Sequence, residues 1–160
     1  MRALAMLLAF GCAEYTTHTR ILDGGQVAGH YICHEPPENA QAEVDMAREL
    51  VIYYMRLIHG PIEPDYDSAP VLVCFTDETL LNDGYVGLHR GNVIWAAIEG
   101  IYGETIAIRH GALLHEFIHD VLERACLLAG CSGDPGHVDL TYWGRASVEG
   151  YAGEAFIGLP

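Results

Sequence analysis

Residues 112–122 read ALLHEFIHDVL and place three titratable side chains, His115, Glu116 and His119, inside an apolar run. On an α-helix, positions i and i+4 lie one turn apart on the same face, so the two imidazoles would point the same way. This is the geometry in which two histidines bind one Zn²⁺. Glu116 is displaced by one position, where it can lie beside the metal without binding it and act as a general base toward water.

The rest of this stretch predicts that the helix is buried. A metal would satisfy polar side chains in such a helix, because imidazole nitrogens buried without partners are costly. We therefore expect one Zn²⁺, with His115 and His119 as ligands and Glu116 as the catalytic residue. The alternative is two partly exposed histidines on an ordinary amphipathic helix. The apolar residues around the motif are Leu113, Leu114, Phe117, Ile118, Val121 and Leu122.

A catalytic zinc site has a third protein ligand and leaves its fourth position to water. His137 is the favoured third ligand, with Asp139 and Glu149 as alternatives. The Gly-Asp-Pro-Gly stretch at 133–136 supplies the turn that brings the chain back to the helix. If His137 binds the metal, Asp139 could instead orient an imidazole. Tyr142 is a candidate donor to the oxyanion formed during hydrolysis, with a packing role as the alternative.

The HEFIHD motif on a buried helix, followed by a further ligand, resembles the zincin metallopeptidases. The resemblance implies an α+β fold, in which a small domain combines a twisted mixed sheet with a backing helix and an active-site helix. It also implies a zinc-dependent peptidase with His115 and His119 as ligands and Glu116 as base. The segment 115–143 is similar to small bacterial lipoproteins in which Gly-Asp-Pro, a histidine and a tryptophan follow the helix, which favours His137.

Two features depart from other zincin patterns. The spacing to His137 is longer than in metzincins, and no methionine follows it to form a Met-turn. The segment 136–144, GHVDLTYWG, partly resembles the aspzincin element Gly-Thr-x-Asp-x-x-Tyr-Gly, in which Gly136, Asp139 and Tyr142 fit. This similarity keeps Asp139 as an alternative ligand.

The chain is strongly acidic, with 22 Asp and Glu against 8 Lys and Arg and a formal net charge of −14. Affinity for phosphate comes from Lys and Arg, so the composition argues against a nucleic-acid partner. Anionic membrane surfaces would also repel this chain. We expect a peptide or protein substrate, and the sequence does not indicate an oligomeric state.

The N-terminus is typical of an export signal, because an arginine precedes an uncharged apolar run, 3–10, that is too short to span a bilayer. The segment 8–12, LAFGC, resembles a bacterial lipobox, in which Cys12 is lipidated and becomes the first residue. We therefore expect a signal peptide at 1–12 and a zincin-like domain at 13–160. The protein would be a lipoprotein of the cell envelope that touches the membrane only through its anchor, with a periplasmic or secreted form as the alternative.

The cysteine count agrees with export, because lipidation of Cys12 would leave four of the five cysteines for two disulfides. Cys126 and Cys131 are close in sequence, which leaves Cys33 and Cys74. Four cysteines nevertheless allow three pairings, and the sequence does not choose among them. The alternative is four reduced, buried thiols.

Hydrophobic periodicity and turn residues predict the remaining elements. They are a β-hairpin around Gly24-Gly25, helices over 38–59 and 105–128, strands over 71–75 and 92–98 in one sheet, and a short helix near 145–156.

Two functions fit these patterns. The first is a zinc-dependent metallopeptidase that hydrolyses peptide bonds with water activated by zinc. The second is a non-catalytic zincin-like lipoprotein, a binding or structural module in which zinc only braces the helix. Glu116 favours catalysis, because a structural zinc site closes with four protein ligands and needs no base.

Overall fold

The computed structural model describes residues 18–76, 86–102, 105–108, 110–128, 130–134 and 136–158, with the backbone alone at 99–102 and 105–108. The expected signal peptide and Cys12 lie outside these residues. Within the described part of the chain, no helix is long and apolar enough to cross a membrane.

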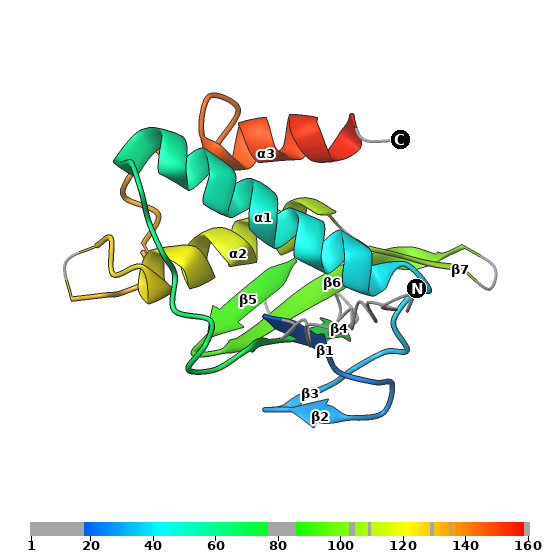
Figure 1. The fold of residues 1–160 in the computed structure, drawn as a ribbon. Coiled ribbons are helices and arrows are strands. Elements are labelled where there is room, and N and C mark those ends of the chain that lie inside the picture. Colours follow the sequence, from blue (N-terminus) through cyan, green and yellow to red (C-terminus); the bar gives the residue numbers. More distant parts are fainter. Residues whose placement is uncertain are drawn as a thin grey trace, which may run out of the picture.

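The described residues form three helices and seven strands, which confirms the predicted α+β class (Figure 1). The strands are β1 (Thr19–Ile21), β2 (Val27–Ala28), β3 (Tyr31–Ile32), β4 (Val71–Thr76), β5 (Gly87–Arg90), β6 (Val93–Tyr102) and β7 (Thr105–Ile108). The helices are α1 (Ala40–His59), α2 (His110–Arg124) and α3 (Val148–Ile157).

The main sheet is mixed, in the order β1-β4-β6-β5, and β7 extends it by pairing with the far end of β6. Strands β1, β4 and β6 run parallel, whereas β5 is antiparallel to β6. The strand predicted over 71–75 is β4, which lies between β1 and β6 and is mostly buried. Figure 1 shows the three helices on one face of this sheet and the β2–β3 hairpin on the other.

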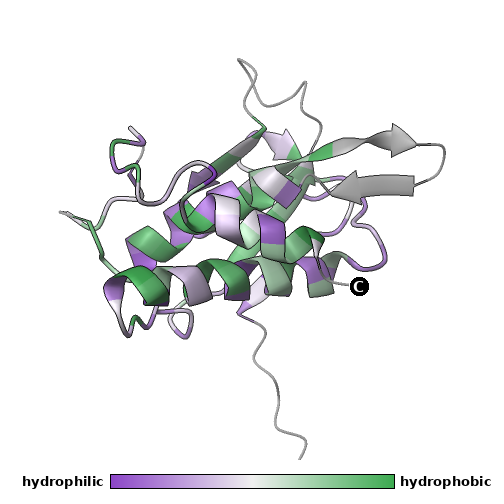
Figure 2. Ribbon diagram, turned by 90° about the horizontal axis from the view of Figure 1, so that it is seen from above, coloured by the Kyte–Doolittle hydropathy of each residue, from purple (hydrophilic) through white to green (hydrophobic). Residues whose placement is uncertain are grey.

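Helix α1 confirms the helix predicted over 38–59. Its buried stripe recurs at three- and four-residue steps and includes Val44, Ala47, Val51 and Met55. It ends at Gly60, whose φ of +78° favours glycine and whose N–H donates to the carbonyl of Arg56 at 3.0 Å. The alternating green and purple segments of the helices in Figure 2 show that each helix carries both apolar and polar residues.

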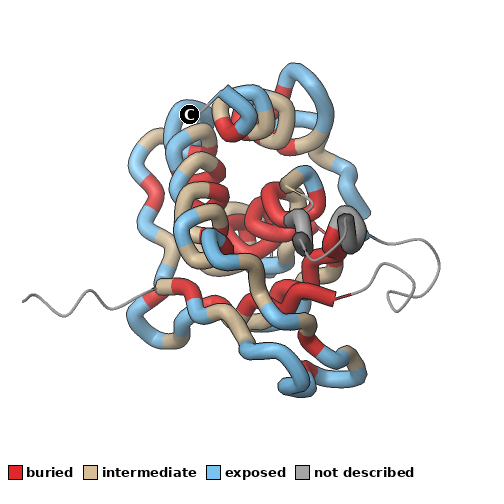
Figure 3. The backbone as a smooth tube through the Cα atoms, turned by 90° about the vertical axis from the view of Figure 1, so that its right-hand side faces the viewer, coloured by how far each residue is buried: buried red, intermediate tan, exposed pale blue. Residues whose placement is uncertain are grey.

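Helix α2 lies in the middle of the molecule, where Figure 3 shows mostly buried chain. All six apolar residues that surround His115, Glu116 and His119 are at most 1% exposed. Burying one such side chain contributes about 1.5–3 kcal/mol, so together they hold the helix firmly in place. The motif therefore sits on a buried helix, as the sequence predicts.

The predicted extent of this helix, 105–128, is wrong at both ends. Residues 105–108 form β7, because Thr105, Ile106 and Ile108 are β-branched and pair with the extended end of β6. The helix ends at Arg124 and the chain turns at Cys126, where φ is +51°. A disulfide from Cys126 to Cys131 closes this turn.

The predicted hairpin around Gly24-Gly25 is also wrong. Strand β1 pairs in parallel with β4, so its partner lies about fifty residues further along the chain. The hairpin present is β2–β3, which turns at Gly29, where φ is +64°. A second disulfide, Cys33–Cys74, ties the end of this hairpin to β4 and lies in a small core with Trp95.

Candidate metal centre

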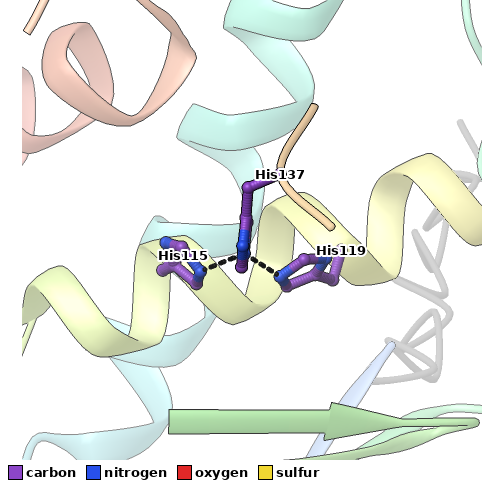
Figure 4. A group of neighbouring side chains, drawn as sticks. All are labelled: His115, His119 and His137. Carbon is purple, nitrogen blue, oxygen red and sulfur yellow. Dashed lines mark hydrogen bonds between the residues drawn. The ribbon is translucent and has the colours of Figure 1, made fainter. Parts of the chain in front are cut away.

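Three histidine side chains converge on one face of α2. His115 and His119 come from successive turns of α2, and His137 comes from the loop that follows it (Figure 4). The Nε2 atom of His137 lies 3.1 Å from Nε2 of His115 and 3.1 Å from Nε2 of His119. These three residues form a group that could hold a metal ion.

The protonation pattern of these rings fits a metal ligand. Nδ1 of His115 donates to the carboxylate of Glu149 at 3.2 Å, and Nδ1 of His119 donates to the carbonyl oxygen of Gly133. A neutral imidazole carries one N–H, so both Nε2 atoms present lone pairs toward His137. Ligand nitrogens around a tetrahedral zinc lie about 3.3 Å apart, given zinc–nitrogen bonds of about 2.0–2.1 Å. The observed spacing is close to that value.

Burial keeps one of the three imidazoles uncharged. It lowers the pKa of His119 to about 4, an effect that the charges of His115 and His137 reinforce. For His115, burial also disfavours the charged form, but the hydrogen bond to Glu149 and the charge of Glu116 raise the pKa above its ordinary value. His119 is therefore neutral at pH 7, as a ligand must be.

Asp134 holds the loop that carries His137. It is 4% exposed, and its carboxylate accepts the backbone N–H groups of Val138 at 3.2 Å and Asp139 at 3.3 Å. Its other donor is the indole N–H of Trp143, at 3.3 Å. Asp134 and His137 both adopt positive φ, near +50°, which these contacts stabilise.

Trp143 forms a wall behind the ligands. Its ring centroid lies 4.5 Å from His115, 4.8 Å from His119 and 4.6 Å from His137. A rigid aromatic surface in contact with all three imidazoles limits their rotation. The residue therefore acts on the site through packing.

Glu149, an alternative third ligand in the sequence, lies behind His115 instead. It stands in the first turn of α3, and Oε2 accepts the N–H of Gly144 at 3.4 Å while Oε1 accepts from His115. The hydrogen bond from His115 lowers the pKa of Glu149 below its ordinary value. A carboxylate in this place orients an imidazole and increases its basicity toward a metal.

Asp139 and Tyr142 lie away from the three histidines. Asp139 accepts the backbone N–H of Thr141 at 2.9 Å and is not part of the histidine group. Tyr142 is 1% exposed, and its hydroxyl lies 3.0 Å from Nε2 of His59 at the end of α1. The structure thus places Tyr142 in the core and does not bring its hydroxyl to the cleft.

Glu116 faces the cleft beside the ligands and is 5% exposed. Burial raises the pKa of Glu116 to about 7, against smaller opposing effects of His115 and His89. A group whose pKa is near the working pH suits proton transfer. The opposite wall is Gly87 on β5, where a Cβ atom would lie 2.7 Å from Cγ and 2.9 Å from Cδ of Glu116. The carboxylate occupies space that any side chain at position 87 would fill.

A cleft of about 500 Å³ contains this site. Its walls are β5, the ligand face of α2 and the loop from Ser132 to His137. A second hollow, of about 390 Å³, lies between α1 and α3 near Tyr54 and Tyr151, away from the histidines. Of these two cavities, only the first is lined by the three histidines and Glu116.

The sequence did not identify several residues that complete the site. Gly87, His89 and Gly133 reach it through tertiary structure and have no characteristic spacing to the zinc motif. Asp120 is another, since its fully buried carboxylate accepts from Tyr66 Oη at 3.0 Å and from Arg124 Nε at 2.7 Å. The only sequence signal for Asp120 was its position directly after a ligand.

Comparison with protein-family models, curated proteins and solved structures gives no significant match. The chemistry of the site is therefore argued from its own residues.

Proposed function

We propose that this protein is a zinc-dependent peptidase with a zincin-like catalytic site. The observation that carries the proposal is the position of Glu116. Its buried carboxylate lies beside the three convergent imidazoles but does not belong to the group that could hold the metal. A structural zinc site is closed by four protein ligands. Three ligands and an adjacent base in an open cleft are what hydrolysis requires.

The residues of the site would have the following roles. His115, His119 and His137 would hold Zn²⁺, which when bound polarises a carbonyl oxygen and makes water acidic enough to lose a proton near neutral pH. Glu116 would accept that proton as water attacks the carbonyl carbon, and would then deliver it to the leaving amine. Burial raises the pKa of Glu116 above its ordinary value, which helps the carboxylate to take up the proton and to return it.

The supporting residues would keep this arrangement rigid. Glu149 and the carbonyl of Gly133 fix the orientation of two imidazoles, and Trp143 packs against all three. The apolar core beneath α2 keeps water away from the back of the helix. Such support matters because misplacing a catalytic group by about 1 Å can cost roughly 100-fold in rate.

The proposal is tested by incubating zinc-loaded protein with an unfolded protein and analysing the products by mass spectrometry. We expect new peptide termini, their loss when a chelator removes the metal, and their return when zinc is restored. Zinc binding without any cleavage would instead support the non-catalytic module, in which the metal only braces α2.

Gly87 provides a second test. Gly87→Ala should lower the turnover number roughly 10–100-fold, because the new methyl group would displace the Glu116 carboxylate. Zinc content should not change, since the three atoms nearest to the new methyl group all belong to Glu116 and none to a histidine. The matched control is Gly111→Ala on α2, where a Cβ atom meets nothing within 4 Å. If Gly87→Ala had the same turnover number as the wild type and the control, the position of Glu116 would not depend on its contact with β5.

A further inference from the structure

The cleft continues past the three histidines toward the end of α2. Glu123 lines this part and lies four residues after His119, so it extends the same helix face by one turn, about 6 Å along the axis. The bond being cleaved would lie next to the three histidines. The next group of the substrate would then lie about 6 Å from them along the helix axis, beside Glu123. This end of the cleft is therefore a place for a neighbouring part of the substrate.

His89 on β5 forms the opposite wall of this part of the cleft. Its side chain is 5% exposed and lies between two carboxylates, with Nε2 3.5 Å from Asp120 and Nδ1 3.8 Å from Glu123. Nε2 is buried and has no hydrogen-bond partner among the described residues. A buried ring nitrogen without a partner is costly unless a further group completes the contacts of the ring.

The surroundings indicate which nitrogen carries the proton. Asp120 is a fully buried carboxylate that accepts a hydrogen bond from Arg124, and Nε2 of His89 faces it, so an N–H of His89 belongs on Nε2. Nδ1 faces Oε2 of Glu123 at 3.8 Å, too far for a direct hydrogen bond. A cationic N–H group placed between Nδ1 and Oε2 would contact both atoms.

Arg90, which also lines the cleft, lies on the other face of β5. Successive side chains of a strand point to opposite faces, so Gly87 and His89 share the face toward α2 while Leu88 and Arg90 share the other. Leu88 packs against the small core around Trp95, on the face away from the helices. Alternation along β5 therefore places Arg90 on the face opposite His89, at the end of the strand.

We propose that His89 and Glu123 form a subsite for a cationic group of the substrate, the ammonium or guanidinium that neighbours the cleaved bond. This inference rests on the proposed function, because the subsite is part of the same cleft. A net charge of −14 favours the approach of cationic substrates to this protein. The group can come from a basic side chain or from the amino terminus of a peptide.

The test measures binding of hydroxamates to the zinc-loaded protein by calorimetry. Each probe carries the same zinc-binding group, and only its side chain and amino group differ. Nα-acetyl-lysine hydroxamate carries a side-chain cation, norleucine hydroxamate carries a free amino group, and Nα-acetyl-norleucine hydroxamate carries neither. We expect one of the two cationic probes to bind roughly three- to tenfold more tightly than the neutral probe, and which one does so identifies the source of the cation.

Glu123→Gln should abolish this preference without changing the affinity for the neutral probe. The charge-matched control is Glu154→Gln, because Glu154 is exposed on α3, away from the cleft, and its loss should leave the preference intact. Equal binding of all three probes, or tighter binding of Nα-acetyl-glutamate hydroxamate, would overturn the subsite and leave the metal site standing. Failure of every hydroxamate to bind would remove the open metal position and the subsite with it.

Discussion

Replacing Glu116 with glutamine should lower the rate of peptide hydrolysis by roughly 10²–10⁴-fold, the usual cost of losing a general base. Glutamine has nearly the same shape, so it still fits against Gly87, but it cannot accept a proton from water. The three histidines are untouched by the change, and the zinc content and melting temperature should stay close to those of the wild type.

The experiment compares zinc content, thermal melting and cleavage on paired preparations of wild type and Glu116→Gln. Equal cleavage by both would mean that the activity belongs to a contaminant or uses another base. Loss of zinc together with activity would mean that Glu116 binds the metal, which its separation from the histidine group argues against.

The second large effect concerns the third ligand. His137→Ala should weaken zinc binding by more than about 100-fold, the upper end of what the loss of a supporting partner costs. Its Nε2 atom lies 3.1 Å from each of the other two Nε2 atoms, so no other described side chain occupies that place. Asp139→Asn is the matched control and should change zinc affinity little, because the Asp139 carboxylate accepts a hydrogen bond from Thr141 and does not belong to the histidine group.

Competition with a zinc indicator dye measures both variants under the same conditions. If Asp139→Asn released zinc more readily than His137→Ala, the third ligand would be Asp139, and the loop from 133 to 143 would have to rearrange when the metal binds.

The parts of the fold that could be predicted from sequence are those with a strong local pattern. Helix α1 and strand β4 follow from the spacing and length of their apolar runs, and the burial of α2 follows from the residues around its zinc motif. The shared orientation of His115 and His119 on α2 is a consequence of helical geometry alone. His137 was predicted from the turn residues before it, since Gly133, Asp134 and Gly136 allow the chain to reverse.

The parts that could not be predicted depend on partners distant in sequence. Strand β5 has only four residues and begins with a glycine, yet it forms the wall opposite Glu116. Strand β1 pairs with β4 across a long gap, where the nearby Gly24-Gly25 suggested a local turn. His89 had no partner spacing along the chain and acquires its carboxylate neighbours only when β5 packs on α2.

The central claim, a metal held by three histidines, is tested most directly by elemental analysis of the protein purified without a histidine tag. We predict about one zinc per chain in the wild type, as expected for a single three-histidine site, and none in His119→Ala. A wild-type protein that contains no zinc and cannot be loaded with it would contradict the account.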